Sequence, residues 1–243
     1  MKIIIGGRGR MGQLIKSQAE ARGHKVLGMF DSGNLEALSA LSETADVVID
    51  FSHAANLPWI CAYVKEHGAA LVYGTTGLSD AEEETLKKLA EAHPVFYSAN
   101  FSYGIAVLRK ALRLVTPMLS DSFDIEVIET HHNQKKDAPS GTAKMLVQAM
   151  DPEGNFSRVF GREGMVGARG REIGIHAVRG GTVAGTHEVE FFGQDETLSF
   201  CHIATSRVIF ANGAIRAAEF IAEKNSPDSG CAQTGLYDMD DLV

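Results

Sequence analysis

The N-terminal part of the chain alternates between short apolar runs and longer segments in which apolar residues recur every three or four positions. The short apolar runs predict buried strands. These runs are Lys2–Ile5, Lys25–Phe30, Ala45–Phe51, Ala69–Tyr73 and Val95–Ser98. Helical spacing lies between them in a segment that ends at Gly23 and in Ala54–His67 and Asp80–His93. Strands that alternate with helices pair in parallel, so this part predicts a doubly wound parallel sheet.

The pattern changes after residue 102. Ile105–Leu119 has the apolar spacing of an amphipathic helix, whereas Phe123–Thr130 alternates and predicts a strand. A polar loop then leads into a predicted helix at Gly141–Met150, and residues 151–172 lack periodicity and predict a long loop. Three alternating segments and an amphipathic helix follow: Ile173–Arg179, His187–Phe192, Thr197–Arg207 and Asn212–Lys224. Short glycine turns between the three segments predict an antiparallel meander.

These elements predict an α/β protein with two domains. We expect the first domain to comprise residues 1–102 and 211–243, because the apolar face of the last helix needs a sheet to cover it. We expect residues 103–210 to form a second, α+β domain with a mostly antiparallel sheet.

Composition narrows the functional class. The net charge is 23 − 31 = −8, which disfavours nucleic acid as a partner because that binding needs a basic surface. No apolar run reaches the ~18 residues of a membrane span, and Ile3–Ile5 is too short for a signal peptide. Cys61, Cys201 and Cys231 form neither a disulfide framework nor a zinc motif, so we expect a reducing, cytoplasmic location and no metal site. Cys61 and Cys201 lie on apolar patterns that predict burial.

Gly7, Gly9 and Gly12 form a G-x-G-x-x-G motif directly after the first strand and at the start of a helix. Such glycines allow a tight turn and let the backbone approach a pyrophosphate, which the helix N-terminus attracts. Arg8 and Arg10 add positive charge beside it. The sequence therefore predicts a dinucleotide site.

Asp31, at the end of the second strand, suits the ribose hydroxyls of that dinucleotide and repels a 2′-phosphate. Ser32 beside it supplies no cation, which favours NADH over NADPH. Arg8 can reach a 2′-phosphate, so use of both cofactors stays open.

A polar cluster spans residues 129–143, with the sequence ETHHNQKKDAPSGTA. Ser140-Gly141-Thr142 opens a helix, where hydroxyl and N–H groups suit a carboxylate. Lys135 can bind a second carboxylate or donate a proton, and His131 and His132 titrate near neutrality. Together these groups suit a small dicarboxylate substrate. The plainer alternative is a structural loop in which Ser140 only caps the helix.

The same stretch closely resembles the signature of the 4-hydroxy-tetrahydrodipicolinate reductase family, formerly called dihydrodipicolinate reductases, which act in the diaminopimelate route to lysine. Further segments agree in order: residues 6–12 (GGRGRMG), 50–52 (DFS), 74–77 (GTTG), 98–102 (SANFS) and 210–214 (FANGA). The resemblance spans nearly the whole chain. It implies a Rossmann-like domain, a substrate-binding domain whose sheets join into a homotetramer, and reduction by NADH or NADPH with loss of water.

The resemblance also implies roles for individual residues. It matches His131 to the family's acid–base residue and Lys135 to its proton donor. It matches three residues to contacts with the substrate carboxylates: His132, Gly141 and Thr142. The residues that it matches to cofactor contacts are Gly6, Gly7, Arg8, Gly9, Arg10, Met11, Asp31, Gly74, Thr75, Thr76, Ser98, Ala99, Asn100 and Phe101.

Two alternatives to this function remain at the level of the sequence. One is another reductase of the same architecture, such as an amino-acid or homoserine dehydrogenase, which would not need a loop for two carboxylates. The other is a protein that senses NADH without catalysis. We expect three histidines at the surface of the second sheet, with a position facing a pocket as the alternative: His176, His187 and His202. We expect three arginines in a solvated loop, with closure over an anionic substrate as the alternative: Arg162, Arg169 and Arg171.

Overall fold

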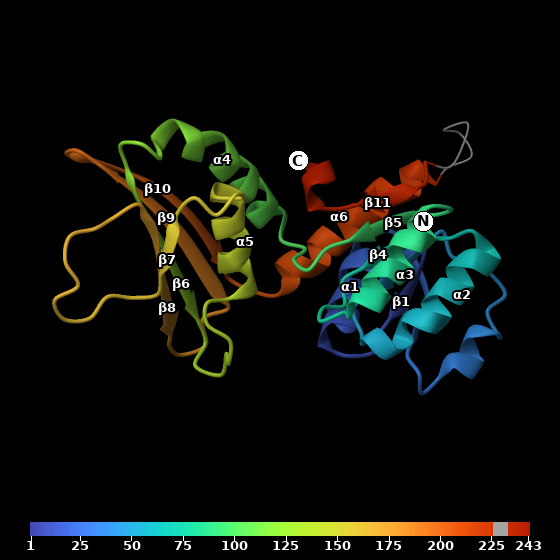
Figure 1. The fold of residues 1–243 in the computed structure, drawn as a ribbon. Coiled ribbons are helices and arrows are strands. Elements are labelled where there is room, and N and C mark those ends of the chain that lie inside the picture. The colour runs from blue at the N-terminus through green and yellow to red at the C-terminus, as the bar shows by residue number, and fades with distance from the viewer. Residues whose placement is uncertain (226–232) are drawn as a thin grey trace. The chain divides into compact units, whose positions relative to one another are not determined.

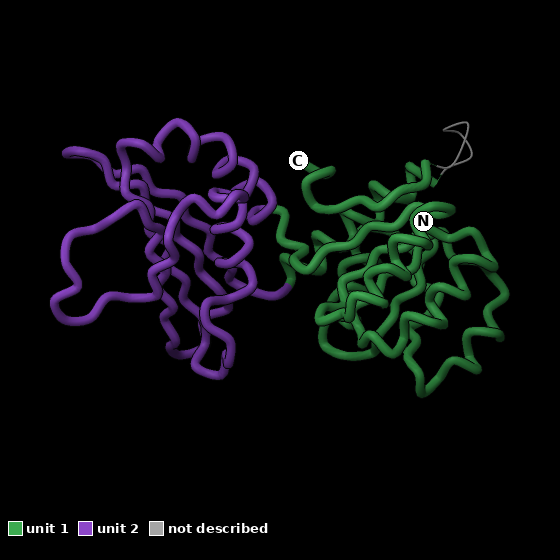
Figure 2. Tube along the Cα trace, viewed as in Figure 1, with its two compact units in different colours: residues 1–103, 208–243 green, residues 104–207 purple. Residues whose placement is uncertain are grey.

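A computed structural model describes residues 1–225 and 233–243 and divides the chain into two compact units. Unit 1 comprises Met1–Tyr103 and Val208–Val243, and unit 2 comprises Gly104–Arg207 (Figure 2). The last part of the chain therefore returns to the first unit.

Unit 1 is built on a six-stranded sheet in the order β11-β5-β4-β3-β1-β2, in which every pair of neighbours is parallel (Figure 1). The sequence-based prediction of a doubly wound parallel sheet is thus confirmed. The strands are β1 (Lys2–Gly6), β2 (Lys25–Phe30), β3 (Val47–Asp50), β4 (Ala70–Tyr73), β5 (Pro94–Tyr97) and β11 (Gly235–Tyr237). Strand β11 was not predicted, because its three residues are too few to show a pattern.

Helices cover both faces of this sheet, which explains why its strands read as continuous apolar runs. Side chains of α2 and α3 pack with Ile4, Val48 and Leu71 in one core cluster. Helix α6 packs against α1 and strands β3, β4 and β5, so the last long helix lies on the first sheet. The helical elements are α1 (Arg10–Ala21), η1 (Leu35–Leu38), η2 (Ala54–Asn56), α2 (Leu57–His67), α3 (Asp80–Ala90), α6 (Val208–Lys224) and η4 (Met239–Leu242).

Unit 2 contains a five-stranded sheet in the order β10-β9-β6-β8-β7. Its strands are β6 (Asp124–His131), β7 (Ser157–Val159), β8 (Glu172–Arg179), β9 (Gly185–Gly193) and β10 (Glu196–Ala204). Helices α4 (Tyr103–Leu119) and α5 (Gly141–Met150) pack on the same face of it, around Val127, Val189 and Phe191 (Figure 1).

The antiparallel meander predicted for unit 2 is correct only for β9 and β10, which pair antiparallel, because β8 does not pair with β9. Strand β6 lies between β8 and β9, parallel to β8 and antiparallel to β9, so the sheet is mixed rather than mostly antiparallel. Alternation along a strand records only which face is buried and is the same for either direction of pairing. The predicted loop at 151–172 also contains β7, a short strand parallel to β8.

The opposite face of the unit 2 sheet carries no helix in the described chain, and apolar side chains lie exposed on it. Val178 on β8, Phe192 on β9 and Ile203 on β10 belong to this face, and Ile203 is 65% exposed. Cys201 shares the face and is exposed, so its predicted burial is wrong, whereas that of Cys61 is confirmed. Cys231 lies outside the described residues.

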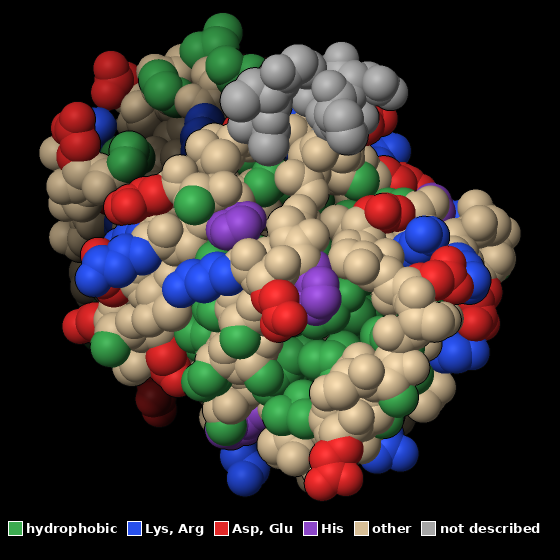
Figure 3. Space-filling view, turned by 90° about the vertical axis from the view of Figure 1, so that its right-hand side faces the viewer, with side chains coloured by type: hydrophobic (Ala, Val, Ile, Leu, Met, Phe, Trp, Pro, Cys, Tyr) green, Lys and Arg blue, Asp and Glu red, His purple; other side chains and the backbone are tan. Residues whose placement is uncertain are grey.

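Unit 1 also has an open hollow of mixed polar and apolar lining. Figure 3 looks onto this unit and shows apolar side chains gathered among charged ones. A cavity of about 440 Å³ is lined by η1, by α2 and by the segment that joins η1 to β3. Its lining includes Leu38, Trp59 and Tyr63. The residues that line it include none of those predicted to bind cofactor or substrate. No helix in the described residues has the length and apolar character needed to cross a membrane.

Candidate active site

The glycine loop of unit 1 joins β1 to α1 and holds its backbone open. Gly7 has φ +98° and its N–H donates to the Phe30 carbonyl at 2.7 Å, which fixes the turn. A Cβ on Gly12 would collide with the Gly7 carbonyl oxygen, so the helix needs glycine there to start close to the turn. Gly9 caps α1 without a side-chain bond, and a Cβ on it would meet nothing within 4 Å. Arg8 and Arg10 are exposed beside this open helix start, with Met11 half-buried next to them.

Asp31 follows β2, the strand next to β1, and is anchored in a tight turn. Its Oδ1 accepts from the Gly33 N–H at 2.9 Å, and its own N–H donates to Asn34 Oδ1 at 2.8 Å. The carboxylate is therefore held at the carboxyl edge of the sheet. A dinucleotide fits these features: an uncapped helix start for its pyrophosphate and a fixed carboxylate for ribose hydroxyls.

Strand β3 ends in a buried carboxylate that organises the same edge. Asp50 is 0% exposed and accepts from the hydroxyls of Ser52 at 2.5 Å and Thr75 at 2.6 Å. Thr75 Oγ1 in turn accepts from the Ser52 N–H at 2.9 Å. Burial raises the pKa of Asp50 to about 6, against the lowering effect of the two hydroxyl bonds. Asp50 also contacts Gly6, since a Cβ at Gly6 would collide with it.

The loops after β4 and β5 complete this edge. The Gly74 N–H donates to the Asp50 carbonyl at 2.8 Å, and the Ser98 N–H donates to the Tyr73 carbonyl at 3.3 Å. The Ser98 hydroxyl donates to the Asn100 carbonyl at 2.9 Å, and the Phe101 ring packs on Phe51 with centroids 4.9 Å apart. Thr76 and Ala99 are exposed in these loops. Thus β1, β3, β4 and β5, neighbours in the sheet, bring the predicted cofactor residues to one edge.

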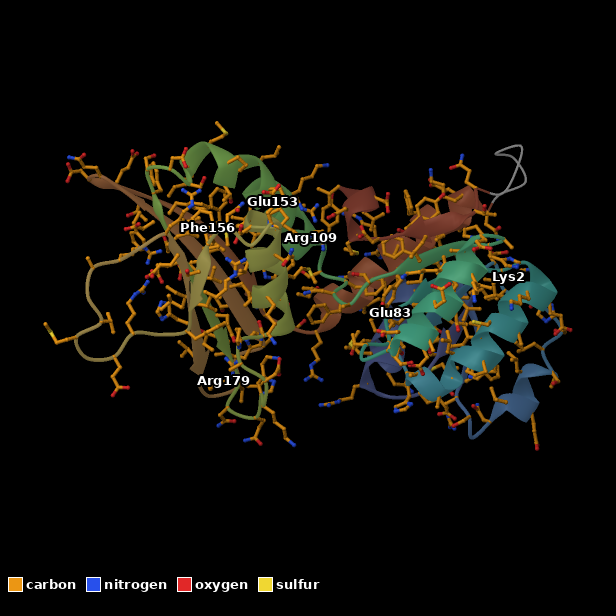
Figure 4. The ribbon with its side chains drawn as sticks, in the orientation of Figure 1. Lys2, Glu83, Arg109, Glu153, Phe156 and Arg179 are labelled. Atoms are coloured by element: carbon orange, nitrogen blue, oxygen red, sulfur yellow. The ribbon has the colours of Figure 1, made fainter. Side chains whose placement is uncertain are left out.

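The predicted catalytic residues lie in unit 2. One face of β6 there carries apolar side chains in its first half and polar side chains in its second half. Ile125, Val127, Glu129 and His131 alternate on that face and are all buried. His131 Nδ1 lies 2.5 Å from Glu129 Oε2. Arg179 (labelled in Figure 4) lies at the end of β8, opposite His131 in the register. It bonds both oxygens of Glu129, at 2.9 and 2.7 Å.

The start of α5 is tied to the same group. Ser140 caps the helix by accepting from the Ala143 N–H at 3.1 Å, and its own N–H donates to Glu129 Oε1 at 3.0 Å. The Ser140 hydroxyl also bonds His187 Nε2 at 3.0 Å. Gly141 follows at the surface, where a Cβ would meet nothing within 4 Å. Open space therefore borders the first turn of α5, as a carboxylate site needs.

The remaining predicted residues lie on the loop between β6 and α5. Lys135 is ion-paired with Asp137 at 2.8 Å, and this pairing lowers the pKa of the Asp137 carboxyl. His132 is half-buried directly after β6, and Thr142 is half-buried in the first turn of α5. The Arg179 guanidinium donates to the Asp137 carbonyl at 2.7 Å, which ties this loop to β8.

Three residues of this cluster have no role in the sequence-based predictions. The sequence does contain a signal for Glu129, because a residue two positions before His131 on a strand lies on the same face of the sheet as His131. Arg179 and His187 have none, since only the strand register brings them there. His187 was expected at the sheet surface but is 4% exposed, because it faces α5. Arg162 and Arg169 lie in the predicted loop and pair with Glu126 of β6.

Comparisons with known proteins match both units of the chain. The model for the N-terminus of dihydrodipicolinate reductase matches residues 1–101, and the model for its C-terminus matches residues 104–243. The chain is 39% identical over 246 residues to the 4-hydroxy-tetrahydrodipicolinate reductase of Exiguobacterium sp., covering 100% of this chain and 95% of the relative. It is 40% identical over 248 residues to that of Alkaliphilus metalliredigens, covering 100% and 99%.

A solved structure shares the fold. It is the dihydrodipicolinate reductase from Paenisporosarcina sp. TG-14, with dipicolinate bound. The TM-score is 0.79 at 24% identity, over 100% of this chain and 99% of that chain.

Proposed function

The chain belongs to the dihydrodipicolinate reductase family, and from this premise we propose how its own residues carry out the reaction. The protein is an oxidoreductase that reduces 4-hydroxy-tetrahydrodipicolinate to tetrahydrodipicolinate, with loss of water, in the diaminopimelate route to lysine. The observation that carries the proposed assignment of roles is the loop from Glu129 to Thr142, where a histidine fixed by a carboxylate borders an open helix start.

Unit 1 is the nucleotide-binding unit in this proposal. NADH or NADPH supplies a hydride when bound. The glycine loop of residues 6–11 receives the pyrophosphate, and Asp31 accepts from the ribose hydroxyls. The loops at Gly74–Thr76 and Ser98–Phe101 line the rest of the carboxyl edge. We propose a preference for NADH, because the Asp31 carboxylate repels a 2′-phosphate.

Unit 2 binds the substrate, a small dicarboxylate. The first turn of α5, at Gly141 and Thr142, receives one carboxylate, because helix N-termini attract anions. The Lys135 ammonium and His132 receive the other. Lys135 exchanges its ion pair with Asp137 for the substrate, so the ammonium has a carboxylate partner in either state. The dipicolinate bound in the solved relative has the same two carboxylates.

His131 handles the proton in this proposal. Its Nδ1 faces the Glu129 carboxylate, so Nε2 is the atom that exchanges a proton with the substrate. Lys135 is the second proton donor. His131 is the last residue of β6, and Lys135 lies on the loop that follows it.

We further propose a homotetramer formed through the uncovered face of the unit 2 sheet. Val178, Phe192 and Ile203 are exposed on that face, and apolar surface of this kind is typical of contacts between subunits. A reducing cytoplasm suits this enzyme, because Cys201 is an unpaired and exposed thiol on the same face.

The first test follows NADH and NADPH oxidation with substrate formed in situ from pyruvate and aspartate semialdehyde. We expect oxidation that depends on substrate and a preference for NADH of about tenfold, equivalent to about 1.4 kcal/mol. His131→Gln should lower kcat about 100-fold with little change in KM, and Lys135→Ala should lower kcat and raise KM. Lys88→Ala, on the exposed side of α3, is the matched control and should leave both constants unchanged.

Three outcomes contradict the proposal in different ways. Unchanged kinetics in both variants would remove His131 and Lys135 from the reaction. A folded protein that binds NADH but oxidises neither cofactor would favour the sensor alternative. Turnover of amino-acid substrates instead would favour another dehydrogenase of this architecture.

A further inference from the structure

Glu129 is the most completely bonded carboxylate of unit 2 and has no assigned role. Its side chain is 0% exposed. Oε2 accepts from the His131 ring and from Arg179, and Oε1 accepts from the Ser140 N–H and from Arg179, four bonds in all. Burying a carboxylate this deeply is costly unless every bond is satisfied, and here each oxygen has two donors.

We infer that Glu129 is a positioning residue for the reduction: it fixes the tautomer and orientation of His131 and ties that ring to the carboxylate-binding start of α5. This inference rests on the proposed function, because it concerns the residue assigned there to proton transfer. Glu129 acts through His131 and is not itself in contact with the reacting atoms.

The tautomer follows from the chemistry of the bond. An ionised carboxylate only accepts hydrogen bonds, so His131 Nδ1 must carry the proton at 2.5 Å from Glu129 Oε2. Nε2 is then the nitrogen that gains and loses a proton. A Cβ on Gly185 would lie 3.0 Å from Nε2, so the glycine keeps that nitrogen uncrowded.

Arg179 keeps Glu129 in the accepting state. Burial by itself raises the pKa of the Glu129 carboxyl, but the bonds from Arg179, His131 and the Ser140 N–H outweigh it and the pKa is lowered. The bidentate pairing also fixes the plane of the carboxylate. Because Arg179 donates to the Asp137 carbonyl as well, it holds the Lys135 loop in the same network.

The His131 ring is held from a second side. His187 packs edge-on against it with centroids 5.1 Å apart, and its Nε2 bonds the Ser140 hydroxyl. Burial and the neighbouring His131 lower the pKa of His187 to about 4, so it stays neutral beside His131 at physiological pH. Ser140 thus bonds both Glu129 and His187. These two residues in turn contact the His131 ring, Glu129 through a hydrogen bond and His187 through edge-on packing.

The direct test reads the tautomer without measuring activity. A long-range ¹H–¹⁵N spectrum of the wild-type protein distinguishes a protonated Nδ1 from a protonated Nε2, and the His131 signals are those lost in His131→Gln. We expect the neutral ring to carry its proton on Nδ1. A ring that carries it on Nε2 would overturn the inference, whatever the enzyme turns over.

The kinetic test is a double-mutant cycle. Glu129→Gln should lower kcat about 100-fold, because the amide cannot accept from His131, Ser140 and Arg179 together. Glu129→Asp keeps the charge and should recover about tenfold of that loss. In the His131→Gln background, Glu129→Gln should change kcat by less than about threefold, because the residue it positions is gone. Equal effects of Glu129→Gln in both backgrounds would show a purely structural role.

A matched control is available in unit 1. Glu219 on α6 also accepts from a histidine and an arginine, His24 at 2.9 Å and Arg22 at 3.5 Å. Glu219→Gln should leave kcat and KM unchanged. If His131→Gln itself retains wild-type kcat, the proposed function fails; if His131→Gln is impaired and the cycle is additive, only the positioning role fails. Should Glu129→Gln not fold, the wild-type spectrum and Glu129→Asp still decide the question.

Discussion

At the scale of single residues, two buried carboxylates behave in opposite ways because their donors differ. Asp50 receives two hydroxyl bonds, and burial raises its pKa to about 6. Glu129 accepts instead from a guanidinium, an imidazole ring and a backbone N–H, and its pKa is lowered although burial acts to raise it. Hydroxyl groups satisfy a carboxylate but do not balance its charge. Asp50 therefore changes its protonation state near pH 6.

The raised pKa of Asp50 predicts that the difference in stability between the wild-type protein and Asp50→Asn changes with pH. The folded pKa of Asp50, about 6, is above its usual 3.8. The stability that the protonated carboxyl contributes is therefore complete below about pH 3.8 and is lost as pH rises through about 6. Asp50→Asn removes this dependence, so relative to wild type it should gain about 2 kcal/mol between about pH 4 and pH 8 in urea unfolding. A difference that is constant over this range would contradict the raised pKa.

At the scale of elements, the two proposed binding positions both use the start of a helix, but they are built differently. Helix α1 begins at Gly9, which offers no side-chain bond, so its first N–H groups face the proposed pyrophosphate site. Helix α5 begins at Ser140, whose hydroxyl caps the Ala143 N–H while its own N–H is held by Glu129. The first arrangement leaves room for a large anion, and the second fixes the helix start in place for a small one.

Removing the Ser140 cap of α5 tests whether this residue affects the stability of the protein, the binding of the substrate, or both. Ser140→Ala should lower the stability of the protein by about 2 kcal/mol, because both the α5 cap and the bond to buried His187 are lost. The substrate KM should also rise about fivefold, because the first turn of α5 loses the hydroxyl bonds that fix it to His187 and to the Ala143 N–H. The measurements are thermal unfolding and steady-state kinetics.

The control for this prediction is Ser79→Ala, which removes the capping box of α3. It should lower stability by about 1 kcal/mol without changing the substrate KM. A rise in KM of equal size in both variants would mean that lost stability, rather than the position of α5, affects binding.

At the scale of the whole molecule, the two sheets differ in how they are covered. The unit 1 sheet has helices on both faces, and the unit 2 sheet has α4 and α5 on one face within the described chain. The other face carries exposed Val178, Phe192 and Ile203. A half-covered sheet of this kind is completed most simply by a second copy of the same surface.

The proposed tetramer can be tested on this face. Ile203→Glu should reduce the mass in solution from four times 26.1 kDa toward smaller species, because it places charge in an apolar contact. Leu114→Glu is the matched control, since Leu114 is 67% exposed on α4 and lies off the sheet face. Sedimentation at several protein concentrations measures both. A wild-type monomer, or equal dissociation by both variants, would contradict the proposal.

The sequence by itself determined the features that depend on local pattern. Residues 3–5 and 47–49 are uniformly apolar because both faces of their sheet are buried, and that pattern is visible without the structure. The glycine motif, Asp31 and the loop from His131 to Thr142 are contiguous in the chain, so their chemistry and the family could be identified from residue order. Helix α5 was predicted with its observed bounds, because Ser140 marks its start.

Only the tertiary structure decided which strands are neighbours. Alternation on β6, β8 and β9 is compatible with several orders, and the observed order places Arg179 and His187 beside Glu129. It also decided that Cys201 is exposed, because coverage of one face is a property of the packed sheet. Residues about 50 apart in the chain, Glu129 and Arg179, meet through register alone. The physical reason is that periodicity records whether a face is buried, whereas the partner across a strand is chosen by the packing of the whole unit.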